Sequence, residues 1–236
     1  MLYKLTLFWI VLLNTFIYAK DLHIKYEISF GIFGKVGTAL AHLHTDKNSY
    51  SIEIEGKATG LAKNMSGGRE EIHKSRGSLK NGLFISNSYQ VTKLYKGKKS
   101  QKTYNINHKT KKVTKKYIKS QNGKTFYTNQ RVLAFYSTND LLTLYFNIAS
   151  LIPNRAKQAI YTFQAIGAEK QNGVVKIIVP ASSQKANYWN ISAIIYQKIF
   201  ASNQGELQLY IDKDGITQKA ILKDVLLFGD ITVQRI

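Results

Sequence analysis

The sequence predicts a mainly β protein, with a single curved antiparallel sheet or a partly open β-barrel or sandwich and one packed α-helix. Three observations favour this class. Apolar and polar residues alternate over many short stretches, as in strands with one face toward a core and one toward solvent. Turns containing Asn-Gly or Gly recur between these stretches, which favours hairpins and therefore antiparallel pairing. Fifteen Tyr, eleven Phe and only two Pro among 236 residues suit pleated surfaces.

Residues 1–19 have the pattern of a signal peptide. Lys4 supplies a positive charge, an apolar run extends from Leu5 to Leu13, and Ala19 offers a small residue for cleavage. Because the run is shorter than the roughly 20 residues of a membrane-spanning helix, an uncleaved anchor is the second choice. We therefore expect cleavage near Ala19, a periplasmic location, and a single β-rich domain over residues 20–236.

The first part of this domain predicts three strands and a short helical corner. Leu22 to Phe30 alternates strictly between apolar and polar residues. The glycines that follow predict a bend, after which we expect strands at Val36–Asp46 and Tyr50–Ile54. The small residues of Ala58–Met65 predict the helical corner that ends this part of the chain.

The middle of the chain predicts a meander of consecutive hairpins. We expect strands at Gly68–Leu79, Leu83–Tyr95, Gln101–Asn107 and Lys111–Lys119, with a further turn at Gln121–Gly123. Consecutive hairpins give antiparallel neighbours, so this part predicts a sheet without crossover connections.

This meander is strongly basic. No Asp or Glu occurs between Ile72 and Asn139, and these residues include 16 of the 34 lysines and arginines of a chain with a formal net charge of +20. Aromatic and branched residues separate the cations, so the stretch can fold as strands with a cationic face instead of remaining disordered. Such a face predicts an anionic partner, and a solvated lysine face without a partner is the alternative.

We expect these lysines to lie on the outer side of strands whose Tyr and Ile side chains turn inward. In an exported protein such a face suits an anionic envelope lipid, lipopolysaccharide or another acidic envelope component, and export argues against nucleic acid as the partner. Another envelope protein is a further possible partner. The candidate residues for binding the anionic partner are Lys93, Lys96, Lys98, Lys99, Lys102, Lys111, Lys112, Lys115, Lys116 and Lys119.

One helix is predicted, from Asp140 to Ile152. Its apolar face carries Leu144 and Ile148 at helical spacing, and Pro153 ends it. Either Thr138 or Asn139 can cap its start, with Asp140 in the first turn. Strands resume after the helix, at Gln158–Gly167, Val174–Val179, Asn187–Ser202, Glu206–Asp212, Ile216–Leu222 and Leu226–Val233.

Several segments carry a resemblance to a known family. They are Tyr26–Phe30 followed by Gly34–Gly37, Ala58–Ala62, Asn139–Tyr145, Leu207–Gly215 and Phe228–Val233. In this order they resemble the first hairpin, the small-residue corner, the helix and the last strands of an uncharacterised family of bacterial periplasmic proteins, the domain of unknown function 3108. The resemblance implies a secreted, β-rich, single-domain protein and brings no catalytic residues with it.

A second group of candidate residues has metal-ligand chemistry. His42, His44 and Asp46 stand two residues apart, so on a strand all three share one face. Two imidazoles and a carboxylate can hold a metal ion, with Asp46 as third ligand or as a partner of the ligands. The alternative is an exposed polar face beside a turn at Lys47–Asn48.

The sequence favours a binding protein over an enzyme. The chain has no Cys, which excludes a disulfide scaffold, a thiolate metal site and a cysteine nucleophile. No Gly-x-Ser-x-Gly elbow is present, and Glu53, Glu55, Glu70 and Glu71 are the richest acidic positions, where salt bridges to lysine are the simpler interpretation. We expect a non-catalytic envelope protein without a cofactor. The alternatives are a periplasmic metal-dependent hydrolase and an assembly factor that pairs through a sheet edge.

Overall fold

A computed structural model describes residues 20–236 except residues 66, 169, 182, 184–186, 197–203 and 226–228. The expected signal peptide over residues 1–19 lies outside the described residues, as do the ends of two expected strands, 197–202 and 226–228. Within the described chain, the strands form one antiparallel sheet of 14 members that does not close. The predicted fold class, a mainly β protein with one packed helix, is confirmed.

The elements follow the predicted order with one addition. The first eight strands are β1 (Lys20–Phe30), β2 (Lys35–Thr45), β3 (Ser49–Ala58), β4 (Glu70–Lys80), β5 (Leu83–Tyr95), β6 (Lys98–Asn107), β7 (Lys112–Gln121) and β8 (Lys124–Val132). The last six are β9 (Ala159–Gln164), β10 (Val174–Val179), β11 (Tyr188–Tyr196), β12 (Gln204–Asp212), β13 (Thr217–Val225) and β14 (Gly229–Arg235). The helices are α1 (Gly60–Met65) and α2 (Leu141–Leu151), with short 3-10 turns η1 (Gly31–Phe33) and η2 (Lys170–Gly173).

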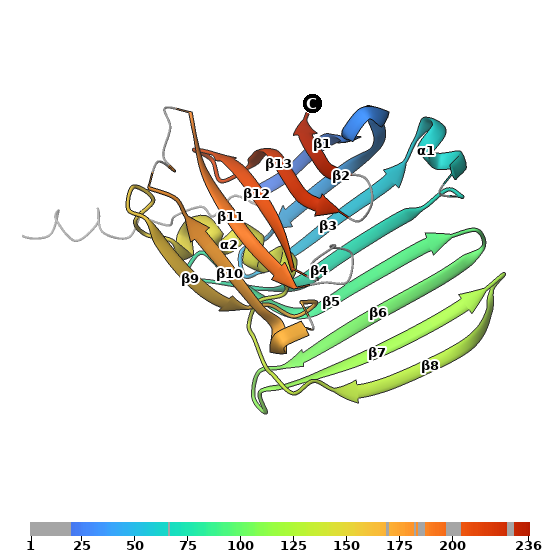
Figure 1. Ribbon diagram of the computed structural model, residues 1–236. Coiled ribbons are helices and arrows are strands. Elements are labelled where there is room, and N and C mark those ends of the chain that lie inside the picture. The colour runs from blue at the N-terminus through green and yellow to red at the C-terminus, as the bar shows by residue number, and fades with distance from the viewer. Residues whose placement is uncertain are drawn as a thin grey trace, which may run out of the picture.

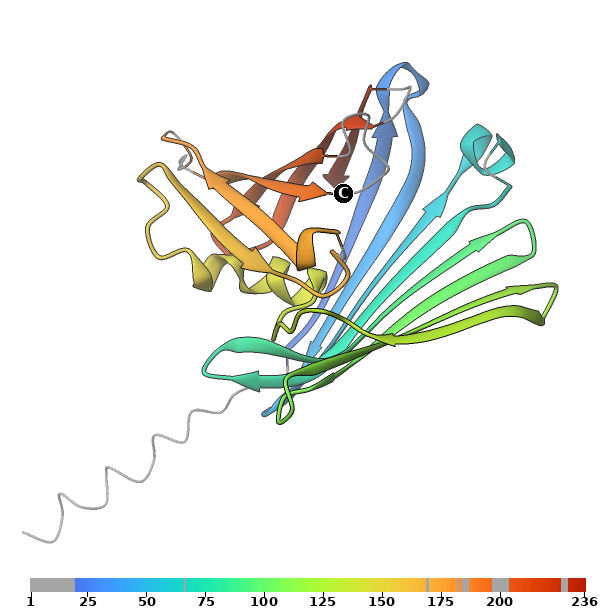
Figure 2. The same ribbon diagram turned by 60° about the horizontal axis from the view of Figure 1, so that its bottom comes forward.

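The order of the strands in space makes α2 a connection between the two edges of the sheet. The order runs from β8 back to β1, then from β14 back to β9, so β1 and β14 pair at the middle. The unpaired edges are β8 and β9, which flank α2 in the sequence. Figure 1 shows the long strands β1–β8 fanning out from this middle, and Figure 2 shows the curved sheet with α2 between its two arms.

Tight turns set the register of the long arm, the N-terminal arm of the sheet formed by β1–β8. Asn81, Lys96 and Asn122 have positive φ, and each is followed by a glycine that also has positive φ. Two successive residues with positive φ are what a type I′ hairpin requires, so the predicted turns are confirmed. The turn at Asn122 leads into β8, for which the sequence predicts no strand. Every residue of β8 is exposed, so no apolar residue marks an inward face there.

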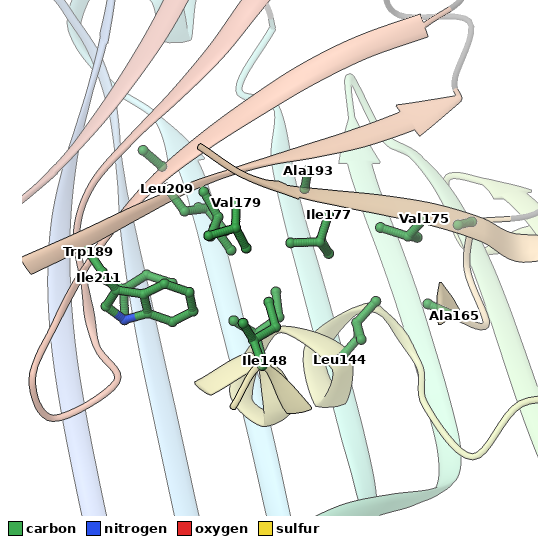
Figure 3. Packing of buried hydrophobic residues seen from close by; sticks show 14 residues of the cluster. Leu144, Ile148, Ala165, Val175, Ile177, Val179, Trp189, Ala193, Leu209 and Ile211 are labelled. Carbon is green, nitrogen blue, oxygen red and sulfur yellow. The ribbon is translucent and has the colours of Figure 1, made fainter. Parts of the chain in front are cut away.

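One side of α2 packs against the C-terminal arm. Leu144 and Ile148 are each only 3% exposed and contact side chains of β10, β11 and β12 (Figure 3). Among their neighbours are Ile177, Trp189 and Ile211, all of them buried. This cluster closes the space between the helix and the strands that follow it.

The other side of α2 packs against the N-terminal arm. Leu142 belongs to a second buried cluster with Ile52 of β3, Tyr89 of β5 and Tyr104 of β6. Tyr145 is half-buried, and its hydroxyl donates to Thr217 Oγ1 at 2.7 Å. The helix is therefore apolar on two sides, because it is covered by both arms of one sheet.

Asp140 is the N-cap of α2, in place of Thr138 or Asn139. Its Oδ1 accepts hydrogen bonds from the backbone N–H groups of Leu142 and Thr143 at 2.8 and 2.9 Å. The N-cap residue has extended backbone angles, which Asp140 shows and which its capping box with Thr143 requires. The aspartate that the sequence places in the first turn thus acts one position earlier, because its carboxylate reaches both amides.

The same carboxylate ties the helix to β4 and β5. Ser75 and Ser86 both donate to Asp140 Oδ2, and the bond from Ser86 measures 2.6 Å. Asp140 is fully buried, and this burial raises the pKa of its carboxyl although the serine and backbone hydrogen bonds oppose the shift. Two turns later, Asn147 makes two hydrogen bonds of 2.9 Å with the backbone N–H and C=O of Phe84 in β5.

Leu144→Ala should destabilise the protein by roughly 2–5 kcal/mol, because it leaves a cavity between α2 and the C-terminal arm. Urea denaturation of both proteins measures the change. Ile160→Ala is the matched control, since Ile160 is 68% exposed, and surface substitutions usually change stability by about 0.5 kcal/mol or less. An equal midpoint for Leu144→Ala and the wild type would show that the helix is peripheral.

Asp140→Ala should lower the free energy of unfolding by at least about 2 kcal/mol, since it removes an N-cap and leaves buried donors without their acceptor. Asp214→Ala changes an exposed aspartate and should have little effect. Thermal unfolding followed by circular dichroism compares the two variants. Similar melting temperatures for both would contradict the anchoring role of Asp140.

Candidate anion-binding face

The register of the long arm decides which face each lysine occupies. Directly paired residues of neighbouring strands share a face. Tyr89, Tyr104, Lys115 and Arg131 are successive partners across β5, β6, β7 and β8. Because Tyr89 and Tyr104 are buried in the cluster beside α2, this whole row lies on the inner face of the sheet.

Two more rows extend the inner face away from this core. In one, Lys102 pairs with Tyr117; in the next, Lys119 pairs with Tyr127. Lys98 follows on the same face of β6, two residues before Ser100, the partner of Lys119. We name this surface the inner Lys–Tyr face. Its members are Lys93, Lys98, Lys102, Tyr104, Lys115, Tyr117, Lys119, Tyr127 and Arg131.

The expectation that the lysines lie on the outer side, opposite the tyrosines, is wrong for half of the candidates. Lys93, Lys98, Lys102, Lys115 and Lys119 share the inner face with the tyrosines. Lys99, Lys112 and Lys116 lie on the outer face, and Lys96 and Lys111 have positive φ at turns. The physical reason is the two-residue period of a strand, because Lys102 and Tyr104, or Lys115 and Tyr117, must point the same way.

Lysines and tyrosines of the inner face alternate in direct contact. The ammonium groups of Lys102, Lys115 and Lys119 lie 5.8, 5.8 and 5.3 Å from the centre of the Tyr117 ring. Lys119 also lies 5.2 Å from the ring centre of Tyr127, and Lys115 lies 5.8 Å from that of Tyr104. The negative ring faces attract the ammonium groups, so several cations gather around one half-buried tyrosine.

A chain of hydrogen bonds runs from the core to the edge of this face. Tyr89 OH lies 2.7 Å from His73 Nδ1, and His73 Nε2 lies 2.8 Å from Glu71 Oε1. Lys93 donates to the other oxygen of Glu71 at 2.8 Å. An ionised carboxylate only accepts, so His73 donates through Nε2; in the neutral imidazole Nδ1 then accepts from the Tyr89 hydroxyl.

Glu71 is the acidic member of this chain, and its charge is fixed. Burial opposes its ionisation, but the hydrogen bond from His73 and the charge of Lys93 outweigh burial and lower the pKa of Glu71 to about 2. Glu71 is therefore ionised and already paired within the protein. The cations farther along the inner face have no acidic residue of β5–β8 beside them, since that stretch contains none.

The inner Lys–Tyr face can hold an anion that has an apolar part. Lysine ammonium groups suit phosphate or carboxylate oxygens, while the flat tyrosine rings and the lysine stems offer apolar surface. Tyr127 is 42% exposed, so aromatic surface of the inner face remains accessible at the edge of the sheet.

The candidate metal ligands lie elsewhere, on the outer face of β1 and β2. His42 and His44 share this exposed face, where they meet Asp21 of β1. Asp46 lies beyond the strand, and its Oδ1 accepts from the backbone N–H of Lys47 at 2.7 Å. His23, at position i+2 from Asp21, completes the group. The strict alternation of the first strand was the signal that could have found Asp21 and His23, because it assigns both to the wet face.

Two of the other acidic candidates, Glu53 and Glu55, form ion pairs. Glu53 lies 2.9 Å from Lys74, and Glu55 is paired with Lys57. These contacts follow the salt-bridge interpretation of the acidic positions.

Among the helices of the described chain, none has the length and apolar character needed to cross a membrane.

Comparison with known proteins agrees with this architecture. The family model described as a protein of unknown function (DUF3108) matches residues 25–233. The crystal structure of a β-barrel-like protein of domain of unknown function DUF1849 from Brucella abortus has a TM-score of 0.51 and 9% sequence identity, and the match covers 92% of this chain and 95% of that chain. At this identity the likeness concerns the fold alone. No curated protein matches the sequence significantly.

Glu71→Gln should destabilise the protein at pH 7 by roughly 2–3 kcal/mol, because it removes a carboxylate whose folded-state pKa is lowered. This stabilisation is complete above the ordinary pKa of 4.5 and is lost as pH falls toward the folded value of about 2. The difference between the two proteins should therefore shrink below pH 4.5, which urea denaturation at pH 7, 4.5 and 3 measures.

Glu53→Gln is the control for this experiment. Its ion pair with Lys74 is exposed, and exposed pairs contribute at most about 1 kcal/mol. A difference between wild type and Glu71→Gln that stays constant from pH 7 to pH 3 would refute the assignment of a depressed pKa.

Proposed function

This chain belongs to the DUF3108 family, and we propose that it is an exported, non-catalytic protein of the bacterial cell envelope that binds an anionic amphiphile on its inner Lys–Tyr face. The observation that carries the proposal is the gathering of Lys102, Lys115 and Lys119 around Tyr117 on the inner side of the sheet. A lysine face that served only for solubility would not need to be inside the curve of the sheet.

The charge of this face supports an anionic ligand. Glu71 is the acidic group nearest in register, and it is already bonded to His73 and Lys93. The cations of β6, β7 and β8 therefore keep a net positive field toward the inside of the curve. A basic residue close to an anionic lipid surface contributes on the order of 1 kcal/mol, so several together support measurable binding.

The aromatic surface supports an amphiphile over a small inorganic anion. Tyr117 and Tyr127 stand edge to face with ring centres 5.6 Å apart, and Tyr127 is 42% exposed. The faces of such rings can cover apolar chains or sugar rings, which a free inorganic phosphate does not have. A phospholipid or lipopolysaccharide combines both chemistries, and the signal-peptide pattern of residues 1–19 supports the periplasm, where such molecules occur.

A second candidate function has its own observation. β8 is an unpaired edge of the sheet within the described chain, and all nine of its residues are exposed. An edge of this kind can accept a strand from another protein, so an assembly factor that pairs through β8 is the alternative. The lysines and the arginine of β7 and β8 favour an acidic strand as that partner.

Replacing the inner lysines Lys98, Lys102 and Lys119 by Gln should weaken binding to anionic vesicles by at least about tenfold, since each cation contributes on the order of 1 kcal/mol. Co-sedimentation with phosphatidylglycerol vesicles at 0.1 M salt measures this. Binding by the wild type should fall at 1 M salt, where the Debye length shrinks from about 10 Å to about 3 Å.

The control removes the same charge from the other face. Lys99, Lys112 and Lys116 replaced by Gln change three outer lysines, and this variant should bind nearly as well as the wild type. Equal losses in the two triple variants would mean attraction by net charge alone. Absence of wild-type binding at low salt would leave the inner face without an anionic lipid partner.

A further inference from the structure

The outer face of β1 and β2 gathers three of the chain's five histidines around one aspartate. In the β1–β2 ladder Asp21 is the direct partner of His44, and His23 is the direct partner of His42. Two adjacent cross-strand pairs on one face place four side chains together, with neighbouring Cβ atoms about 5 Å apart. All four side chains are exposed.

The potential ligand atoms of this group are close to one another. Those of Asp21, His23 and His42 all lie within 4.8 Å of each other. His42 Nε2 is 2.7 Å from Asp21 Oδ1, and His44 Nδ1 is 3.4 Å from the same oxygen. The rings of His23 and His42 stack with centres 4.0 Å apart. Within the residues that the structure describes, no other three His, Cys, Asp or Glu side chains meet in this way.

We propose that Asp21, His23 and His42 bind a divalent cation of the Zn²⁺ class on the outer face of β1 and β2. Two imidazole nitrogens and a carboxylate oxygen are a ligand set that Zn²⁺, Cu²⁺ and Ni²⁺ prefer, whereas Mg²⁺ and Ca²⁺ prefer oxygen alone. His44 stands beside the same carboxylate oxygen and can help to orient it as a partner of the ligand.

The electrostatic surroundings are compatible with a bound cation. Asp21 brings a carboxylate to this face, and His42 and His44 both lie beside the same oxygen of it. Glu53 of β3 is the cross-strand partner of His42 and brings a second negative charge to this face, where it is paired with Lys74. Lys25, two residues after His23, is the nearby positive charge on β1.

This site is separate from the inner Lys–Tyr face. Leu22 and Ile24, which alternate with the proposed ligands along β1, point to the buried side of the sheet. The metal would therefore lie on the opposite face from the proposed amphiphile, and binding of either one can be tested without the other.

Isothermal titration of the purified protein with ZnCl2 at pH 7.5, without an affinity tag that contains histidine, tests the proposal. We expect one Zn²⁺ per chain. The affinity should be at least about tenfold weaker for His23→Gln and for His42→Gln, since losing even a residue that only hydrogen-bonds to a metal ligand weakens metal binding by that factor. His108→Gln is the matched control. His108 belongs to another part of the sheet, where it lies 2.9 Å from Tyr136 OH.

Two further measurements separate a built site from weak association with surface imidazoles. Zn²⁺ affinity should fall at pH 5.5, because protonated imidazole cannot be a ligand, and MgCl2 should give no saturable binding. Absence of saturable Zn²⁺ binding by the wild type would overturn the proposal. So would equal affinities for His42→Gln and His108→Gln, provided that circular dichroism shows both to be folded.

Discussion

The buried carboxylate of Asp140 is the interaction on which the arrangement of this fold depends. An open sheet that curves on itself needs something to fill the inside of the curve, and α2 does so between the two arms of the sheet. Asp140 starts the helix through two backbone amides and fixes it through Ser75 and Ser86 on two neighbouring strands. Oδ1 accepts from the helix amides and Oδ2 accepts from the serines, so one carboxylate both caps the helix and holds it on the sheet.

A single helix cannot cover the inner face of 14 strands, and this constraint explains the chemistry of the uncovered part. Next to α2 the face is apolar, with Ile52 and Tyr89 buried. Across β6, β7 and β8 it changes to lysines that pack along tyrosine rings. In this part the ammonium groups can stay in contact with water, while the lysine stems and tyrosine rings pack against one another. The surface is therefore charged and apolar at the same time. An amphiphile matches both halves of that surface.

The elements of the fold were predictable because their signals are local. Alternation along β1, the Asn-Gly turns and the helix ended by Pro153 each depend on a few neighbouring residues. β8 was missed because an edge strand exposed on every residue has no apolar period. The N-cap was misplaced by one or two residues because Thr138, Asn139 and Asp140 are all good caps, and only contact with Ser75 and Ser86 from β4 and β5 selects Asp140.

By itself, the sequence determined the β class, the long helix before Pro153 and the basic character of the middle strands, since composition and short-range periodicity express these directly. The sequence also determines that Lys102 and Tyr104 share one face of their strand, because they stand two residues apart and side chains of a strand alternate with a period of two. Only the tertiary structure decided that this face is the inner one, and that Asp21 joins His42. Both facts depend on which strands pair and how the sheet curves, and those follow from contacts between residues far apart in the chain.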